Sequence, residues 1–266
     1  MRLRKLVVFD RLMARLLVVA KDRWVLKGAV ALEVRLGARF RTTKDMDLAR
    51  QDSEQAATTD FLAAQSVDLG DYFTLAIQRT KKLDAALEGA AVRYHVYAEL
   101  AGRPFEDVIV DVGFSDPLVS HPDLLRGPDL LSFAGINPIE VPVLPLEQHV
   151  AEKVHAYTRS YAGGHLSSRV KDLIDLVLIL SNSAFHAGCL RRALHATSDT
   201  RGTHTLPTTL PSPPPHWGPA YRKMATEVGL NPDISVGYGQ VAAFLDPILG
   251  GTVPDSAHWD STRRTW

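Results

Sequence analysis

Two aspartates separated by one residue are the feature of this sequence that most directly suggests chemistry. Asp45 and Asp47 flank Met46 in a segment, 45–49, that we expect to form a strand. Residues two apart on a strand point to the same side, so both carboxylates are expected to lie together. Two like charges that close are costly unless a cation neutralises them. Oxygen ligands of this kind favour Mg²⁺, which keeps several waters and binds phosphate oxygens of its substrate.

A glycine turn precedes this pair in the chain. Lys27-Gly28-Ala29 joins a short predicted strand, 23–27, to a predicted helix, 29–36, which Gly37 ends. The backbone N–H groups and the dipole at the start of a helix attract phosphate. The turn and the aspartate pair together predict a place for the triphosphate of a nucleotide beside Mg²⁺.

A third carboxylate, Asp111, lies inside the apolar stretch 108–112. Burying an unpaired carboxylate is expensive, so this residue needs a partner. The partner is either a basic side chain in a salt bridge at a strand edge, or a metal ion that Asp111 ligates while also accepting the proton of an attacking hydroxyl. The sequence leaves both interpretations open.

A second polar cluster falls on two predicted helices, 145–161 and 168–181. Asp172 and Asp175 are three residues apart and share a helix face, and Lys153 lies on the preceding helix. A short glycine-containing loop joins the helices, so we expect antiparallel packing that brings Lys153 near Asp175. This pair is either an interhelical salt bridge or a lysine that contacts a triphosphate, oriented by an aspartate.

These residues require a mixed α/β framework to position them. Periodicity predicts helices over 4–21, 53–65, 184–196, 220–228 and 237–249, and strands over 71–77, 91–100, 105–114 and 139–143. Residues 115–138 are expected to be loop with short helical pieces, and the last dozen residues to be loose. We predict four regions: a core over 1–143, a helical domain over 144–205, a proline-rich linker over 206–219 and a helical tail over 220–266.

Composition excludes several classes of protein. The formal net charge is zero, so the chain is not a globally basic nucleic-acid binder. A single cysteine, Cys189, excludes an intrachain disulfide framework and fits a reducing compartment. The basic and apolar N-terminus is interrupted by charges and lacks a cleavage site, and no uncharged run is long enough to span a membrane. We therefore expect a cytoplasmic protein without a membrane partner.

Four motifs in order resemble the AbiEii/AbiGii nucleotidyltransferase toxins, the toxins of AbiE-type toxin–antitoxin systems, which include the mycobacterial MenT toxins. They are Lys27-Gly-Ala-Val-Ala-Leu32, Arg41-Thr-Thr-Lys-Asp-Met-Asp-Leu48, Leu146-Glu-Gln-His-Val-Ala-Glu-Lys153 and Arg169-Val-Lys-Asp-Leu-Ile-Asp-Leu176. The resemblance covers about residues 5–197 and leaves the proline-rich tail outside. It implies a polymerase-β-like nucleotidyltransferase core, a helical C-terminal region, Mg²⁺, and nucleotide transfer from an NTP.

The resemblance also implies roles for single residues. Asp45 and Asp47 match the metal pair, and Asp111 falls where the polymerase-β pattern has its third acid. Lys153 matches the motif lysine, and Asp175 the final motif aspartate, with Asp172 close to it. Ala29 departs from the general Gly-Ser turn and removes a phosphate donor, which Thr42 or Thr43 is expected to replace.

The resemblance implies an acceptor and a partner as well. Mycobacterial members add pyrimidine nucleotides to the 3′ end of tRNA and so block translation, and a cognate AbiEi-type antitoxin is expected to regulate the chain. Basic residues around the metal pair (Arg35, Arg39, Arg41 and Lys44) and further along the chain (Arg79, Lys81 and Lys82) are compatible with RNA or with an ordinary solvated surface. Two alternatives stay open: nucleotidylation of a protein hydroxyl, and a non-catalytic nucleotide-binding protein.

Overall fold

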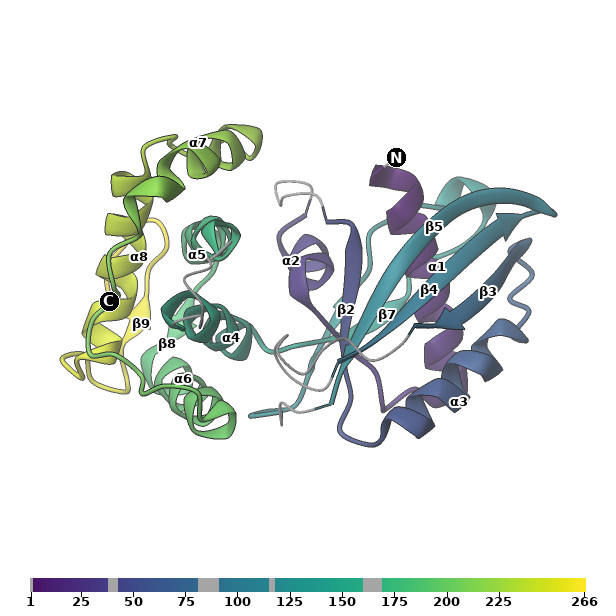
Figure 1. Cartoon of the computed structure of the whole chain (residues 1–266), viewed down its shortest axis with the longest axis horizontal. Coiled ribbons are helices and arrows are strands. Elements are labelled where there is room, and N and C mark those ends of the chain that lie inside the picture. The colour runs from purple at the N-terminus through teal and green to yellow at the C-terminus, as the bar shows by residue number, and fades with distance from the viewer. Residues whose placement is uncertain (1, 38–42, 81–90, 115–117, 160–168) are drawn as a thin grey trace. The chain divides into compact units, whose positions relative to one another are not determined.

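The computed structural model describes residues 2–37, 43–80, 91–114, 118–159 and 169–266, which divide into two compact units. The first unit comprises residues 1–37 and 42–144, and the second comprises 38–41 and 145–266 (Figure 1). None of the described helices is long and apolar enough to cross a membrane.

The first unit is built on a mixed seven-stranded sheet with the strand order β3-β4-β5-β2-β1-β7-β6. Its strands are β1 (Val25–Lys27), β2 (Asp45–Ala49), β3 (Phe73–Arg79), β4 (Ala91–Leu100), β5 (Arg103–Gly113), β6 (Asp123–Arg126) and β7 (Glu140–Val143). The β2–β5 and β1–β7 pairs are parallel and the other pairs are antiparallel. The sheet is thus mixed within the predicted α/β fold, although β6 lies in a segment that was predicted to be loop.

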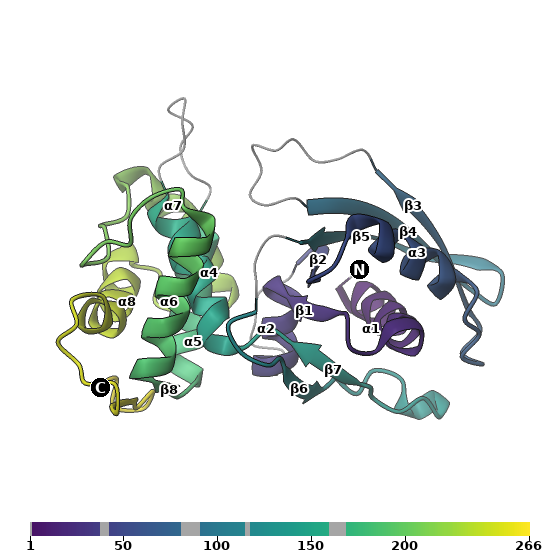
Figure 2. The same ribbon diagram turned by 90° about the horizontal axis from the view of Figure 1, so that it is seen from below.

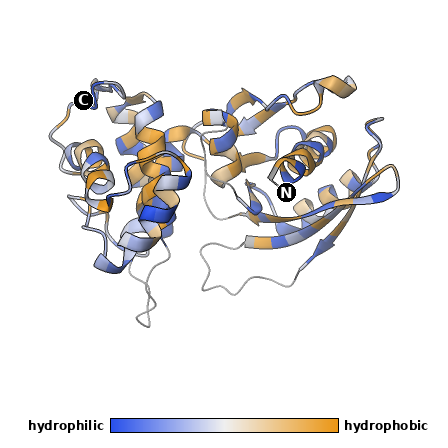
Figure 3. Ribbon diagram, turned by 90° about the horizontal axis from the view of Figure 1, so that it is seen from above, coloured by the Kyte–Doolittle hydropathy of each residue, from blue (hydrophilic) through white to orange (hydrophobic). Residues whose placement is uncertain are grey.

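Helices α1 (Arg2–Ala20) and α3 (Glu54–Gln65) cover one face of this sheet, as Figure 2 shows for the part near β3, β4 and β5. Alternate residues of the strands point into the core beneath them, among them Met46, Leu48, Val96, Val110 and Val112, all less than 1% exposed. The ribbon of α1, which begins at the N label in Figure 3, carries both apolar and polar residues. Helix α2 (Gly28–Leu36) follows β1 directly, and Ser53 caps α3 by accepting a hydrogen bond from the Ala56 backbone N–H.

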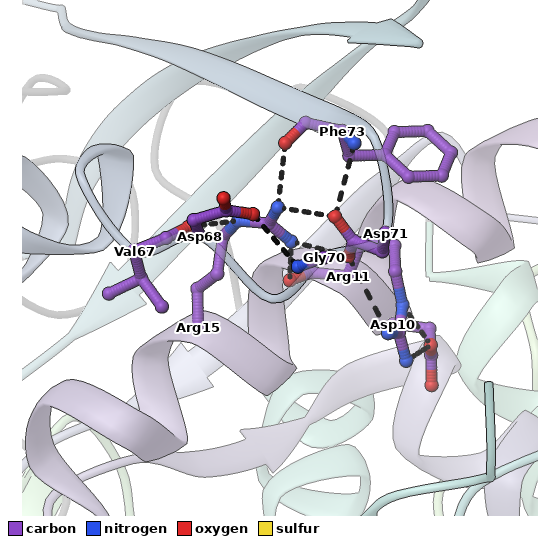
Figure 4. Close-up of polar contacts among 8 residues, drawn as sticks. All are labelled: Asp10, Arg11, Arg15, Val67, Asp68, Gly70, Asp71 and Phe73. Atoms are coloured by element: carbon purple, nitrogen blue, oxygen red, sulfur yellow. Dashed lines mark hydrogen bonds and ion pairs between the residues drawn. The ribbon is translucent and has the colours of Figure 1, made fainter. Parts of the chain in front are cut away.

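A buried ion pair fastens α1 to the chain that leads into β3 (Figure 4). The Arg15 guanidinium donates to both carboxylate oxygens of Asp71, at 2.9 and 2.7 Å, and to the carbonyl oxygens of Val67 and Phe73. Both side chains of the pair are about 1% exposed. Burial by itself raises the pKa of Asp71, but the hydrogen bonds from Arg15 and from the Phe73 N–H outweigh it and hold that pKa below 3.8.

The second unit is helical. It contains α4 (Leu146–Thr158), α5 (Val170–Asn182), α6 (Ala187–Arg201), α7 (Gly218–Glu227) and α8 (Ile234–Leu249), with the short strands β8 (Phe185–His186) and β9 (His258–Trp259) and the turn η3 (Pro215–Trp217). The proline-rich segment packs within this unit. The Tyr157 hydroxyl donates to the Pro211 carbonyl oxygen, and the Leu210 backbone N–H donates to Asp246. The division into four domains stays a prediction.

The prediction that the last dozen residues are loose was wrong. Strand β9 pairs with β8, Trp259 is 2% exposed, and its indole N–H donates to the Leu180 carbonyl oxygen. The Trp266 indole donates to the Phe244 carbonyl oxygen and its ring stacks on that residue. Burial of these large aromatic surfaces orders a segment whose polar composition alone predicts disorder.

Candidate active site

The two aspartates of the motif lie on β2 as predicted. Asp45 and Asp47 share one face of the sheet, while Met46 and Leu48 point into the core. The Thr43 hydroxyl donates to Asp45 Oδ1 at 2.9 Å and fixes that carboxylate at the start of the strand. Thr42 lies outside the described residues.

A row of four charged residues crosses neighbouring strands at this point. Lys27 on β1 is the register partner of Asp47, Asp47 is the partner of Asp111 on β5, and Asp111 is the partner of Arg93 on β4. Register partners present their side chains on the same face. The side-chain charges along the row are therefore positive, negative, negative and positive. The row places Asp111 beside Asp47, the second aspartate of the motif.

Arg93 is the partner that Asp111 was expected to need. Its Nε and one terminal nitrogen each donate to a different carboxylate oxygen, both at 2.8 Å. The predicted salt bridge is thus present, although β5 lies inside the sheet and not at its edge, whereas metal ligation by Asp111 stays a prediction. The pKa of Arg93 is raised, chiefly by the hydrogen bond with Asp111 and further by the charges of Asp45 and Asp47, against the opposing effect of burial. The sequence offered no signal for Arg93, because pairing across strands depends on register.

Gly28 holds the backbone close to Asp47. Its φ is +66°, a conformation that favours glycine, and a Cβ atom there would lie 1.9 Å from Asp47 Oδ2. Any side chain at this position would displace the carboxylate. The Lys27 ammonium lies on the same side of the sheet, 3.7 Å from where a Cβ on Gly113 would be. The turn therefore brings the Gly28 backbone, the Lys27 ammonium and the Asp47 carboxylate to the same side of the sheet.

These residues fit a magnesium ion that arrives with its nucleotide. Within the described ranges, no group of three or more His, Cys, Asp or Glu side chains is arranged to hold a metal ion by itself. Mg²⁺ commonly takes one or two carboxylates and completes its shell with water and substrate phosphates. Two carboxylates on one face, with the backbone of the glycine turn beside them, match that need.

The second polar cluster lies in the helical unit. Lys153 on α4 donates to Asp175 Oδ2 at 2.6 Å and lies 3.5 Å from Asp172 Oδ1, both on α5. Asp175 is 0% exposed and Lys153 is 8% exposed. Arg169 lies 3.6 Å from the other oxygen of Asp172. The predicted approach of Lys153 to Asp175 is confirmed as a contact, whereas its role in a reaction stays a prediction.

The predicted basic surface is partly engaged elsewhere. Arg35 forms an ion pair with Asp123 at 2.6 Å, and Arg79 forms one with Glu54. Lys44 is exposed, and Arg39, Arg41, Lys81 and Lys82 lie outside the described residues. Charge alone therefore gives little support for a nucleic-acid surface in the described part of the chain.

The fold is similar to that of several solved structures, two of which carry descriptions as nucleotidyltransferases. MenT4, a nucleotidyltransferase toxin from Mycobacterium tuberculosis H37Rv, aligns with a TM-score of 0.60 and 21% identity over 97% of this chain and 85% of its own. A candidate nucleotidyltransferase from H. pylori aligns with a TM-score of 0.53 and 15% identity over 94% of this chain and 98% of its own. JHP933 from Helicobacter pylori aligns with a TM-score of 0.51 and 15% identity over 93% of this chain and 94% of its own.

Comparison by sequence extends the resemblance further along the chain than the motifs alone indicate. No curated protein matches the chain. The family described as nucleotidyl transferase AbiEii toxin, type IV toxin–antitoxin system, matches residues 11–249. The proline-rich segment and α7 and α8 thus lie inside the matched region, which corrects the expectation that the resemblance ends near residue 197. With the motifs, the fold and this match in agreement, the chain belongs to the AbiEii nucleotidyltransferase toxin family of type IV toxin–antitoxin systems.

Proposed function

We propose that this chain transfers a nucleotidyl group from an NTP to the 3′-hydroxyl of an RNA, with tRNA as the acceptor, and so blocks translation. The observation that supports this most is the charged row on β1, β2, β5 and β4, which places two carboxylates between a lysine and an arginine, beside Asp45 and the glycine turn. A type IV toxin also has a cognate antitoxin, for which we propose an AbiEi-type partner. Action on tRNA places the protein in the cytoplasm.

The reaction exchanges one P–O bond for another. The acceptor oxygen forms a bond to the α-phosphorus, the bond from that phosphorus to the pyrophosphate oxygen breaks, and the acceptor proton leaves. Asp111 accepts this proton, because each of its oxygens engages Arg93 through one lone pair and keeps a second. When bound, Mg²⁺ neutralises charge on the phosphates, and Asp45, Asp47 and Asp111 are its proposed ligands.

The turn and its neighbours orient the nucleotide. Lys27 offers an ammonium to the phosphates, and Gly28 lets the backbone at the start of α2 approach them. Thr43 holds Asp45 in place through its hydroxyl, and Thr42 and Thr43 are proposed to replace the donor that Ala29 lacks. These contacts serve positioning, which supplies much of the catalysis of phosphoryl-type transfer.

Lys153 is proposed to stabilise the negative charge that grows on the leaving pyrophosphate. Asp175 orients it through the 2.6 Å contact, and Asp172 supports the same ammonium as part of the nucleotide-binding set. Lys153 is thus buried between two carboxylates on α5.

The experiment that tests this proposal identifies the acceptor and the nucleotide together. The purified chain is incubated with Mg²⁺, total tRNA and one α-labelled NTP at a time, and the 3′ ends of the RNA are sequenced. We expect label on tRNA with one or both pyrimidine NTPs. Label on polypeptide in RNA-free reactions would support the protein acceptor instead, and absence of both transfer and Mg²⁺-dependent NTP binding would contradict the proposal.

A further inference from the structure

The face of the sheet that carries the aspartates continues onto β4 and β3, and none of the described helices of the first unit covers that part of it. On β3 the residues Phe73, Leu75 and Ile77 are buried. Thr74, Ala76 and Gln78, which alternate with them, are exposed. On β4 the buried set is Val92, Tyr94, Val96 and Ala98. The side chains of Arg93, His95 and Tyr97 therefore lie on the opposite, open face. Helices α1 and α3 lie on the buried side (Figure 2).

Two aromatic rings form the most distinctive feature of this open face. The rings of His95 and Tyr97 are nearly parallel, with 20° between their planes and 6.5 Å between their centroids. That separation is about twice the rise of one stacked base, roughly 3.4 Å. Tyr97 is 37% exposed. A partly exposed His95 ring and an exposed Tyr97 ring at this spacing suit a planar nucleobase, since any base can stack on aromatic side chains.

The rings lie close to the reaction centre. His95 is the register partner of Ile109 on β5, and Ile109 is the partner of Asp45 on β2. Two strand spacings amount to roughly 10 Å, so the rings are near the aspartates on the same face. This distance fits a single RNA strand that has its 3′-hydroxyl at Asp111 and runs over this part of β4.

Charges on either side of the rings favour a particular orientation of such a strand. Arg93 engages Asp111 through two of its N–H groups and has others for a phosphate. Asp107 is exposed and is the register partner of Tyr97. A carboxylate there repels phosphate but accepts a hydrogen bond from an exocyclic amino group, which cytosine and adenine carry and uracil lacks.

We propose that His95 and Tyr97 form a binding site for one unpaired base of the acceptor RNA, close to its 3′ end. Asp107 accepts a hydrogen bond from the exocyclic amino group of that base. The inference rests on the proposed function, since the site lies beside the aspartates that are proposed to act on the 3′-hydroxyl. It assigns the acceptor to single-stranded RNA and gives it a preference for amino-bearing bases.

The test measures binding of short single-stranded RNA without NTP. Oligocytidine and oligouridine carrying a fluorophore at the 5′ end are titrated with the full chain, and anisotropy gives each Kd. Tyr97→Ala should weaken binding roughly 10-fold, whereas Tyr97→Phe, which keeps the ring, should bind as the wild type does. Asp107→Asn should reduce the preference for oligocytidine over oligouridine. Tyr72→Ala is the matched control, because Tyr72 is also an exposed tyrosine, 79% exposed, and directly precedes β3 of the same sheet.

Two results would overturn this site: equal affinity of Tyr97→Ala and the wild type, or an equal loss in Tyr72→Ala. A wild type that binds no RNA would overturn it as well. Parallel transfer reactions separate this inference from the proposed function. If the wild type labels RNA but Tyr97→Ala binds normally, the base site is wrong and the proposed activity stands. If binding depends on Tyr97 but label reaches only protein, the activity is wrong and the RNA site stands.

Discussion

Arg93 donates one hydrogen bond of 2.8 Å to each carboxylate oxygen of Asp111. This contact neutralises the carboxylate that lies in register with Asp47 on the neighbouring strand. Like charges at that spacing repel, so the arginine permits three acidic side chains to share one face of the sheet. Its guanidinium takes the place that a bound cation fills in electrostatic terms.

Removal of Arg93 should therefore make the fold depend more on divalent cations. We expect Arg93→Ala to lose about 1–3 kcal/mol in the absence of metal, since hydrogen bonds to charged groups are worth that much. Mn²⁺ should restore more stability to this variant than it adds to the wild type. Thermal unfolding with and without Mn²⁺ measures both effects. Arg79→Ala, which breaks the ion pair with Glu54, is the control, and an equal Mn²⁺ effect in both variants would refute this account.

Gly28 and Gly37 provide a matched pair for testing the close approach of the turn to Asp47. Both have positive φ, +66° and +74°, so alanine at either position strains the backbone by about 1–3 kcal/mol. Only at Gly28 does an added Cβ collide with Asp47, whereas nothing lies within 4 Å at Gly37. We expect Gly28→Ala to abolish nucleotide transfer and Gly37→Ala to keep most of it, with similar losses of stability. Activity lost equally in both variants would show that strain, not the position of Asp47, matters.

The Arg15–Asp71 pair should control stability without taking part in catalysis. Asp71→Asn leaves Arg15 buried without its counter-charge, which costs about 3–5 kcal/mol. Because the folded-state pKa of Asp71 lies below 3.8, the stabilisation is present above that pH and is lost as pH falls through the folded pKa. Denaturant unfolding should show the full difference from the wild type at pH 7 and a smaller one below pH 3.8. Asp68→Asn, an exposed turn position, is the control. A difference that does not depend on pH would contradict the assignment.

The Lys153–Asp175 contact allows folding and function to be separated. Lys153→Met alone leaves Asp175, which is fully buried, without its counter-charge and should cost about 3–5 kcal/mol. Adding Asp175→Leu should recover much of that loss, because apolar residues of similar volume often replace a buried pair at little cost. We expect the double variant to be folded but inactive in nucleotide transfer. A folded double variant with wild-type activity would show that the pair is purely structural.

Local patterns predicted most of the first unit. The strand–turn–helix–strand order around Gly28 follows from short-range periodicity, and Asp45 and Asp47 share a face because a strand alternates its side chains. Asp111 was found because a charge stands out in an apolar stretch. Long-range pairing was not accessible in the same way. Arg93 and the ring pair His95–Tyr97 became visible only through the register of β4 with β5, which depends on packing across the whole sheet.

The other misses, at β6 and in the C-terminal segment, have a similar cause. Strand β6 is four residues long and has exposed residues, and it forms because β7 offers an edge to pair with. Trp259 and Trp266 order the C-terminal segment through contacts with Leu180 and Phe244, which are far away in sequence. Propensity over a short window carries no information about such partners.

The most direct test of the central claim is single-turnover transfer of an α-labelled pyrimidine nucleotide to tRNA by Asp45→Asn and Asp47→Asn. Asparagine keeps the size of each side chain and removes the charge, so folding should survive, as thermal unfolding would verify. Loss of several kcal/mol of transition-state stabilisation predicts a decrease in rate on the order of 10³-fold. Asp68→Asn should transfer at the wild-type rate. Transfer to tRNA at the wild-type rate by either of the two motif variants would contradict the assignment of this site.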